Sequence, residues 1–456
     1  MNPNPVFPIR ECYCPAHFGN SYEAMWPLER LSYLKEMKWW GFNLFADWMT
    51  TTDVCDPTDN QFQTLAVASD DRKIAAFLSA QELGMELNLI ITPNHVYLDQ
   101  QRPAYAAKLR KGIFGQLVCP SHPKAREVIL GNFDMWFRKL ANAGIRLSAF
   151  TVFAYDFGGC ACRKCNPWIL TFAELMKEAH DIARNHHPDI EPWVCSWWWT
   201  PEEHRLFNDW CRRKAPGWLK GMTMHILYGE TSFMNVSVPK GCRKVAFAHI
   251  GYSDEVASSD IYTKWGATIA PNRIPATLKG IEGQNAAGFQ AYSEGVFDDI
   301  NKAILAGLAV GKARTSHTIL KIYARRYFGG DADAWADWLE PWGDRRRVDL
   351  KAAKTRFNKL AKTARSGWRL EQLRSKLRLE TLDRAIGQPS QRKWTRKRLG
   401  LADAFWKEQE HLQRDVYRLG PVRHVFARRF HPPKWYDSWM EATTRKTDSE
   451  NLLAEA

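Results

Sequence analysis

The sequence predicts an α/β fold, a (β/α)8 barrel with an α-helical C-terminal domain. From residue 6 to about residue 295, short apolar or aromatic runs alternate with amphipathic stretches, which is the pattern of repeated βα units around a parallel sheet. Eight such units over roughly 290 residues fit a TIM barrel, whose usual size is about 250 residues. Beyond Gly295 the apolar residues recur at helical spacing.

The expected strands are the short apolar runs, and the expected helices lie between them. In chain order the strands are Pro8–Pro15, Phe42–Trp48, Met85–Thr92, Leu147–Ala154, Glu191–Trp198, Met222–Tyr228, Lys244–Ile250 and Gly288–Tyr292. The helices include Pro27–Trp40, Asp70–Leu83, Pro123–Ala143 and Pro167–Asn185. Asn166 is expected at the N-cap of the last of these, with Pro167 as its first helical residue.

Two domains are expected, the barrel over residues 1–330 and a basic helical domain over residues 331–456. Helices are expected at Ile319–Phe328 and from about Asp333 onward, with a break at Gly387–Ser390. No Gly-x-Gly-x-x-Gly follows the first strand, and no Gly-x-x-x-x-Gly-Lys-Ser/Thr follows any strand. The sequence therefore argues against a nucleotide-binding sheet.

The composition is that of a soluble protein that can build a large core. The chain has 456 residues, of which 45% are hydrophobic and 25% charged, and its mean hydropathy is -0.44. No apolar run approaches the roughly 18 residues that span a bilayer, and the N-terminal residues lack a signal-peptide pattern. We expect a cytoplasmic protein without a membrane partner, although an export signal removed beforehand would leave the same sequence. Homo-oligomerisation stays open.

The positive charge is concentrated in the C-terminal part. Residues 341–456 hold 28 Lys and Arg against 14 Asp and Glu, while residues 1–340 hold 36 of each, so the net charge of +14 belongs to the tail. Such a tail can bind nucleic acid, attract anionic substrates or form a solvated helical surface. Its basic residues alternate with apolar ones at helical spacing, which favours the last interpretation over nucleic-acid binding.

Polar and aromatic residues gather where the strands are expected to end. In a barrel these positions share one mouth, which makes them candidates for binding substrate. The candidate substrate-binding residues are Trp48, Asn94, His95, Tyr155, Trp197, Trp199, His225, Glu230, His249, Tyr252 and Tyr292. Tryptophan occurs 21 times, and an indole ring matches the flat apolar face of a sugar. Alternate members of the run Trp197–Trp199 must point away from the barrel interior.

Two carboxylates stand out as catalytic candidates. Asp156 follows the apolar run 150–154 and precedes two glycines, which let the loop turn and leave the acid in the mouth. Glu294 holds the matching place after the last strand. Glycoside hydrolysis needs a proton donor and a second carboxylate that attacks, activates water or stabilises the cation. We assign Asp156 as the donor and Glu294 as the second carboxylate; Asp298 and Asp299 are expected to cap the next helix.

A cysteine cluster follows Asp156 directly. Cys160, Cys162 and Cys165 lie in one loop, and Cys119 lies in the preceding βα connection. Four thiolates form a closed tetrahedral zinc site, which would hold the loop that carries the acid. Cys12-x-Cys14 and His122 are rival ligands. A catalytic zinc, with His17 or His122 in its shell, is the alternative mechanism.

Several of these segments resemble a known group of proteins. The segments are 155–165 (Tyr-Asp-Phe-Gly-Gly-Cys-x-Cys-x-x-Cys), 119–121 (Cys-Pro-Ser), 292–302 and the tyrosine-rich 323–329. Over roughly residues 8–330 the chain resembles bacterial TIM-barrel glycoside hydrolases that are distantly similar to family 20 hexosaminidases and α-glucuronidases. The resemblance implies an exo-acting glycosidase and carries Asp156 and Glu294 over as its catalytic residues.

One position departs from the family 20 pattern. Those enzymes have an Asp-Glu pair after the fourth strand, whereas Phe157 follows Asp156 here. The sequence therefore favours a plain two-carboxylate mechanism over assistance by a substrate N-acetyl group. The expected function is hydrolysis of a carbohydrate substrate, an anionic or an amino sugar, with structural zinc as cofactor. The alternative is a non-catalytic or metal-dependent carbohydrate-binding barrel with a nucleic-acid-binding tail.

Overall fold

The eight expected strands are present and close into one parallel barrel in chain order. The computed structural model describes residues 7–16, 20–49, 62–109 (62–68 by their backbone alone), 115–156, 158–226, 230–255, 266–387, 394–418, 435–436 and 438–440. The strands are β1 Ile9–Tyr13, β2 Leu44–Trp48, β3 Glu86–Ile91, β4 Ala149–Phe153, β5 Glu191–Cys195, β6 Gly221–Ile226, β7 Arg243–His249 and β8 Gly288–Tyr292. Every end lies within three residues of its expected place. The predicted (β/α)8 barrel is confirmed.

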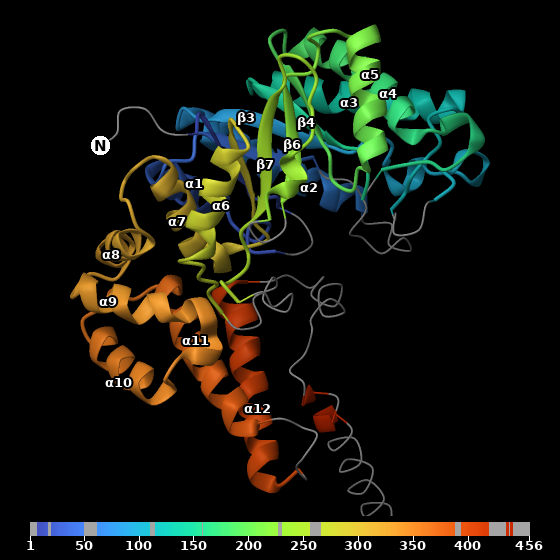
Figure 1. Cartoon of the computed structure of the whole chain (residues 1–456). Coiled ribbons are helices and arrows are strands. Elements are labelled where there is room, and N and C mark those ends of the chain that lie inside the picture. Colours follow the sequence, from blue (N-terminus) through green and yellow to red (C-terminus); the bar gives the residue numbers. More distant parts are fainter. Residues whose placement is uncertain are drawn as a thin grey trace, which may run out of the picture.

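Helices surround the barrel and continue beyond it (Figure 1). Around the barrel lie α1 Pro27–Trp40, α2 Phe62–Glu82, α3 Pro123–Asn142, α4 Trp168–His186, α5 Pro201–Lys214, α6 Arg273–Gly283 and α7 Asp299–Ala309. The C-terminal helices are α8 Ser316–Tyr327, α9 Ala332–Leu339, α10 Leu350–Ala361, α11 Trp368–Ile386 and α12 Arg396–His411. Within the described chain, no helix is both long and apolar enough to cross a membrane.

Three local expectations need correction. Helix α2 begins at Phe62, eight residues before the expected Asp70. Helix α4 begins one residue late, so that Pro167 and not Asn166 is its N-cap. The described residues between β6 and β7 hold only a short 3-10 helix, η5 Ser232–Met234, where a full βα unit was expected. The expected break after α11 is found, since the helix ends at Ile386 and Gly387 has φ 75°.

Inward-facing side chains fill the barrel in layers. The layer near the amino ends of the strands contains Ile9, Leu44, Ala149, Trp193 and Val245. The central layer is polar and contains Glu11, Asn88, Thr151 and Gln290. The layer near the carboxyl ends contains Tyr13, Ala46, Ile90 and Phe247, with Trp48, Phe153, Trp197 and Tyr292 packed against it. The floor of the mouth is therefore aromatic.

Glu11 is fully buried in the central layer. Its Oε1 accepts hydrogen bonds from Asn88 Nδ2 at 2.9 Å and from Gln290 Nε2 at 3.0 Å. Burial disfavours the charged form more than these two bonds favour it, and the pKa of Glu11 rises to about 7. The folded protein therefore holds this proton more tightly than the unfolded chain does.

Glu11→Gln is expected to stabilise the protein at alkaline pH and to have little effect near pH 4. Because the folded pKa is the higher one, the wild type loses stability as the pH rises from the unfolded pKa of about 4.3 to about 7. Each pH unit between the two pKa values corresponds to about 1.4 kcal/mol, so the gain at pH 8 is expected to be roughly 4 kcal/mol. Denaturant unfolding at pH 4 and pH 8 measures it; an equal gain at both would show that the charge is not its cause.

The C-terminal helices pack on the loops at the mouth end of the barrel. Arg345 Nε lies 3.0 Å from Oε1 of Glu255, and Glu255 belongs to the loop after β7. Tyr417 packs on Phe297, just after β8, with 6.4 Å between ring centroids. The two parts share one hydrophobic core, and the domain boundary at residues 330 and 331 stays a prediction.

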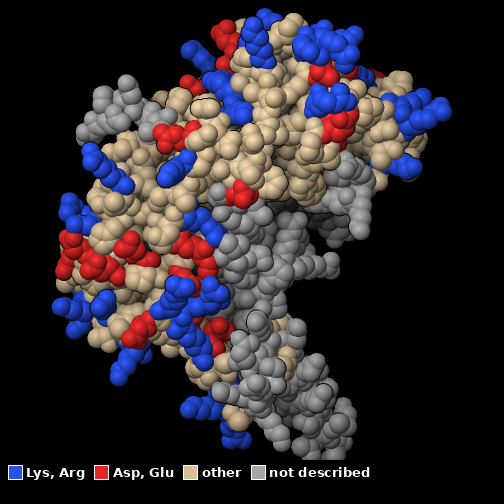
Figure 2. Space-filling model, in the orientation of Figure 1, with Lys and Arg blue, Asp and Glu red and all other residues tan. Residues whose placement is uncertain are grey.

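The tryptophans of the tail contact other side chains of the tail. Trp435 is buried, donates to Asp383 Oδ1 at 2.8 Å and lies 5.2 Å from the Phe405 ring. The ring centroids of Trp394 and Trp435 lie 6.1 Å apart. On the face shown in Figure 2, Lys and Arg alternate with Asp and Glu over the C-terminal helices. These tryptophans therefore pack within the tail, and the solvated-surface interpretation of its charge stays a prediction.

Candidate active site

The mouth of the barrel holds a cluster of aromatic and imidazole rings. The Trp197 ring lies 3.9 Å from that of His225 and 5.6 Å from that of His249, measured between centroids. Tyr292 lies 4.8 Å from His249, and Phe247 forms the floor below. The strands bring these rings together because each follows or ends a different neighbouring strand, from β5 to β8.

Three buried polar atoms of this cluster face no protein partner. Within the described residues, Trp197 Nε1, His225 Nε2 and His249 Nε2 are buried and make no hydrogen bond. Burial lowers the pKa of His225 to about 4 and that of His249, which also faces His225, to about 3. Both imidazoles are therefore neutral at ordinary pH. A buried polar group usually has a partner, and water or a polar ligand in the mouth would supply one to these three atoms.

The two candidate carboxylates lie at the ends of opposite strands, β4 and β8. Asp156 and Glu294 are both half-buried. Burial first, and then the charges of Glu11 and Asp156, raise the pKa of the inward-facing Cys195 to about 12. Glu294 is among the charges that add to the effect of burial in raising the pKa of Tyr13. The charge of each carboxylate therefore contributes to raising the pKa of a group that faces the barrel interior.

Two residues at neighbouring strand ends have an unusual backbone. Asp156 has φ 76° and Trp198 has φ 61°, in the left-handed region that glycine favours. Such a conformation costs on the order of 1–3 kcal/mol in a non-glycine residue and occurs most often at functional sites. The loops after β4 and β5 thus present two side chains at the cost of backbone strain.

The three consecutive tryptophans point in three directions. Trp197 lines the mouth, and Trp198 is 50% exposed beside it, with 5.7 Å between the two ring centroids. Trp199 is 9% exposed and packs on Phe172 and Phe207 of the helix layer, with centroids at 6.0 and 4.9 Å. Of the two tryptophans expected to bind substrate here, the structure places Trp197 in the mouth and Trp199 behind it.

Other expected site residues have structural partners. Tyr155 is buried, and its hydroxyl donates to Glu203 of α5. Glu230 is exposed and accepts a hydrogen bond from the Ser232 amide at 2.7 Å. Tyr252 is buried, with its ring 6.1 Å from that of His249. Trp48 ends β2 and packs on the floor of the mouth; Tyr228 lies outside the described residues.

Asn94 and His95 lie at the end of β3. Asn94 Nδ2 donates to Val118 O at 2.8 Å and to Gly159 O at 2.9 Å, and its Oδ1 accepts from the Gly159 amide at 2.8 Å. Asn94 therefore ties the loop after β3 to the loop that follows Asp156. His95 is buried, and burial lowers its pKa to about 3, so this imidazole is neutral too.

The four cysteines of the predicted zinc site come together. The sulfur atoms of Cys119, Cys160, Cys162 and Cys165 all lie within 4.8 Å of one another. Cys119 Sγ lies 3.6 Å from Cys165 Sγ and 3.7 Å from Cys162 Sγ. A tetrahedral zinc with Zn–S distances of about 2.3 Å places its sulfurs ~3.8 Å apart. The cluster fits a single tetrahedral metal ion.

Without a metal ion, the cysteines of the cluster share protons unequally: the hydrogen bond to Cys160 raises the pKa of Cys165, burial raises that of Cys119, and that of Cys160 is lowered. A hydrogen bond from Cys165 lowers the pKa of Cys160 to about 5 against the effect of burial, and the Cys162 and Lys108 amides add to it. The rival ligands Cys12 and Cys14 lie 3.2 Å from each other and are not part of the cluster. His122 is the N-cap of α3, with its ring against Tyr105, and His17 lies outside the described residues.

The two acids after Glu294 do not cap α7 as expected. Asp298 forms a fully buried ion pair with Lys302, and Asp299 binds Tyr323 Oη at 2.7 Å and Arg369 Nε at 2.7 Å. Neither side chain accepts from an amide at the start of the helix. Both are ion-pair residues: Asp298 pairs within the first turns of α7, and Asp299 connects α7 to Arg369 of α11. Each buried carboxylate depends on its cation, because leaving it unpaired is costly.

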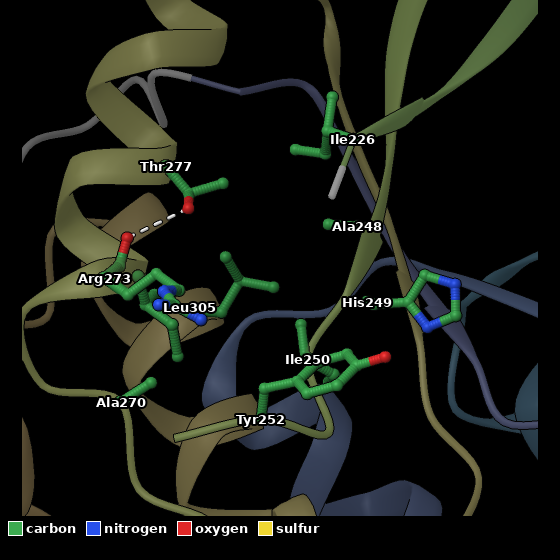
Figure 3. A pocket seen from close by; sticks show the side chains of 10 residues that line it. Ile226, Ala248, His249, Ile250, Tyr252, Ala270, Arg273, Thr277 and Leu305 are labelled. Atoms are coloured by element: carbon green, nitrogen blue, oxygen red, sulfur yellow. Dashed lines mark hydrogen bonds between the residues drawn. The ribbon is translucent and has the colours of Figure 1, made fainter. Parts of the chain in front are cut away.

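A small pocket lies behind the mouth, between β6, β7 and α6. Ile226, Ala248 and Ile250 line it from the strands, and Thr277 and Leu305 close it from the helices. Figure 3 shows the His249 ring on the other face of β7, turned away from these side chains. The pocket belongs to the helix layer and not to the mouth.

Two solved structures of glycoside hydrolases have a similar architecture. A GH138 enzyme described as targeting pectin rhamnogalacturonan II has a TM-score of 0.53 and 10% identity, over 96% of this chain and 66% of that one. CpGH84B has a TM-score of 0.51 and 12% identity, over 94% of this chain and 77% of that one. The fold is that of the TIM-barrel glycoside hydrolases. No protein-family model and no curated protein matches the sequence.

A Thermobaculum terrenum O-GlcNAc hydrolase mutant, with a TM-score of 0.48 and 10% identity, covers 98% of this chain and 90% of its own. The resemblance expected from the sequence is confirmed at the level of fold by the two structures with TM-scores above 0.5. The sequence indicated the run Trp197–Trp199 as candidate sugar-stacking rings, but alternation did not show which of the three is exposed. It gave no sign of the buried acid Glu11.

Proposed function

We propose that this protein is a glycoside hydrolase that cleaves its substrate with two carboxylates, Asp156 and Glu294. The observation that carries the proposal is the set of three buried polar atoms in the mouth, Trp197 Nε1, His225 Nε2 and His249 Nε2, which lack partners in the described chain. Sugar hydroxyls both donate and accept hydrogen bonds, and sugar ring faces pack on indole and phenol rings. The two carboxylates stand at opposite ends of this mouth.

The contacts of Glu294 support its role as the ionised carboxylate. Tyr292 Oη donates a hydrogen bond to Glu294 Oε1, and a hydrogen bond of this kind favours the charged form. Asp156 then protonates the oxygen of the leaving group, while Glu294 either attacks the anomeric carbon or activates the attacking water. If Glu294 attacks, water then cleaves the glycosyl ester and gives its proton to Asp156. If Glu294 activates the water, it takes the proton of that water, and exchange with solvent restores both carboxyl groups.

The metal belongs to the same proposal as a structural zinc. Four thiolates fill a tetrahedral shell and leave no position for substrate. The ion would connect the loop after β3, through Cys119, to the loop that begins at Asp156. Its contribution is to hold that loop in place, and the chemistry stays with the carboxylates.

Replacing one ligand is expected to remove the zinc and to disorder the loop of Asp156. Purified protein is expected to hold one zinc per chain, and Cys165→Ser to hold less than a tenth of that, because three thiolates bind zinc far more weakly than four. Metal analysis measures this, and proteolysis within residues 157–165 reports on the loop. Cys242→Ser is the control, since this thiol lies outside the cluster. Unchanged zinc in Cys165→Ser would contradict the assignment.

A screen of glycosides tests the activity. Aryl glycosides and reducing-end release on neutral, amino and uronic sugars are compared between wild type and Asp156→Asn, with zinc measured on the same samples. The proposal predicts exo-cleavage of an amino or acidic sugar that is lost in the variant while zinc stays bound. Activity lost only on chelation would assign the chemistry to the metal, and no cleavage by wild type would leave a carbohydrate-binding barrel.

A further inference from the structure

The proton donor marks the side of the mouth where the leaving group lies. A general acid must reach the glycosidic oxygen within hydrogen-bond distance, so the part of the substrate beyond that oxygen lies next to it. Asp156 follows β4, which ends at Phe153, and the neighbouring strand β5 is followed by Trp197 and Trp198. The side chains that flank the acid on this side are therefore those that a leaving group meets.

Within the described residues, Trp198 contacts Trp197 with its ring at the rim of the mouth and is not part of the core. Its side chain is 50% exposed, whereas the Trp197 ring packs in the mouth and the Trp199 ring in the helix layer. Its backbone has φ 61°, where glycine, asparagine or aspartate would be less strained. A large apolar ring held exposed in a strained conformation, beside the mouth, is the arrangement of a ligand platform.

We propose that Trp198 is the platform for the leaving group, on which the sugar ring beyond the scissile bond stacks. The proposal rests on the proposed glycosidase function and names the substrate class: glycosides whose leaving group is a second sugar ring. The indole faces the apolar side of that ring, while Trp197 and the two imidazoles bind the sugar that is released from the non-reducing end. Trp198 is a specificity residue and takes no part in proton transfer.

Two substrates with the same glycone separate this role from the chemistry. A glycosyl fluoride has no ring in its leaving group and needs little acid assistance. The β-1,4-linked disaccharide has a sugar ring in its leaving group and depends on the acid. The probes are the glycosyl fluoride and the β-1,4-linked disaccharide, each made with N-acetylglucosamine and with glucuronic acid as the glycone. For Trp198→Ala we expect kcat/KM on the disaccharide to fall by roughly tenfold or more, the loss expected for one stacked ring, and kcat/KM on the fluoride to stay within about twofold.

Three further variants make the test specific. Trp198→Phe keeps a ring and is expected to recover most of the disaccharide activity. Trp198→Gly is expected to lose it as Trp198→Ala does, with a melting temperature at least as high as wild type, because glycine relieves the strain at φ 61°. Trp26→Ala removes a 62% exposed tryptophan at the start of α1, across the barrel, and is expected to leave both rates unchanged.

The outcomes distinguish this inference from the function on which it rests. Equal losses on disaccharide and fluoride, or no loss on either, would overturn the role of Trp198 while the glycosidase stands. Cleavage of neither substrate series by wild type would overturn the function and the platform together. A selective loss on the disaccharide that Trp198→Phe restores would establish the platform.

Discussion

Asp156→Asn is expected to lower kcat by between about 10² and 10⁴ on glycosides with poor leaving groups. The amide cannot give a proton to the departing oxygen, and the size of the loss is that of a positioned general acid. On aryl glycosides whose leaving group is acidic, such as 2,4-dinitrophenyl, the loss is expected to be far smaller, because that oxygen departs as an anion. The dependence of kcat on leaving-group acidity should therefore be steep in the variant and shallow in wild type.

The structure supplies the controls for this experiment. Asp156 lies in the loop held by the cysteine cluster, so zinc content must match wild type before a loss is assigned to proton transfer. Glu294→Gln provides the contrast: as the second carboxylate, it is expected to lose activity on every leaving group alike. A loss in Asp156→Asn that is independent of the leaving group would remove Asp156 from the role of proton donor.

The strands were predictable because a buried parallel strand leaves a clear trace in the sequence. Segments such as Phe150–Ala154 are apolar except for one small polar residue, Thr151, since helices cover one face of the strand and the barrel interior the other. The cysteine cluster was predictable for a related reason: neighbouring βα loops lie side by side, so Cys119 had to lie close to the loop after Asp156. Both predictions need only the order of the strands.

The direction of side chains beyond the strand ends was not predictable in the same way. Alternation holds within a strand, but at φ 61° the chain leaves it, so Trp198 turns outward and Trp199 turns into the helix layer. Tyr155 lies just after the end of β4, as a mouth residue should. Its hydroxyl nevertheless binds Glu203 of α5, which is 48 residues away in the sequence. Which residues bind a ligand depends on such long-range partners.

Buried charges were equally hidden in the sequence. Lys302 of α7 lies four residues after Asp298, a spacing that in most helices marks an exposed pair. Here both side chains are fully buried, and Lys302 Nζ also donates to Tyr22 Oη at 2.7 Å and to Ser293 Oγ at 2.8 Å. The ion pair thus holds the residue next to Glu294, and stability and site geometry depend on the same contact.

Lys302→Met is expected to destabilise the protein by about 3–5 kcal/mol, the cost of leaving a buried carboxylate without its cation. The double variant with Asp298→Asn is expected to recover part of that loss, because the remaining charge is then removed as well. Lys177→Met, at an exposed pair with Asp181, should cost less than about 1 kcal/mol. Denaturant unfolding measures all three.

The same variants test whether the ion pair serves the site. Lys302 Nζ also donates to Gly295 O at 3.2 Å, so Ser293 and Gly295, on either side of Glu294, are both held by one ammonium group. If these contacts position Glu294, the double variant Lys302→Met with Asp298→Asn should regain stability without regaining activity. It restores the charge balance but not the hydrogen bonds from Lys302 to Tyr22, Ser293 and Gly295. Recovery of both together would show that Lys302 matters to the fold alone, and that Glu294 takes its position from Tyr292.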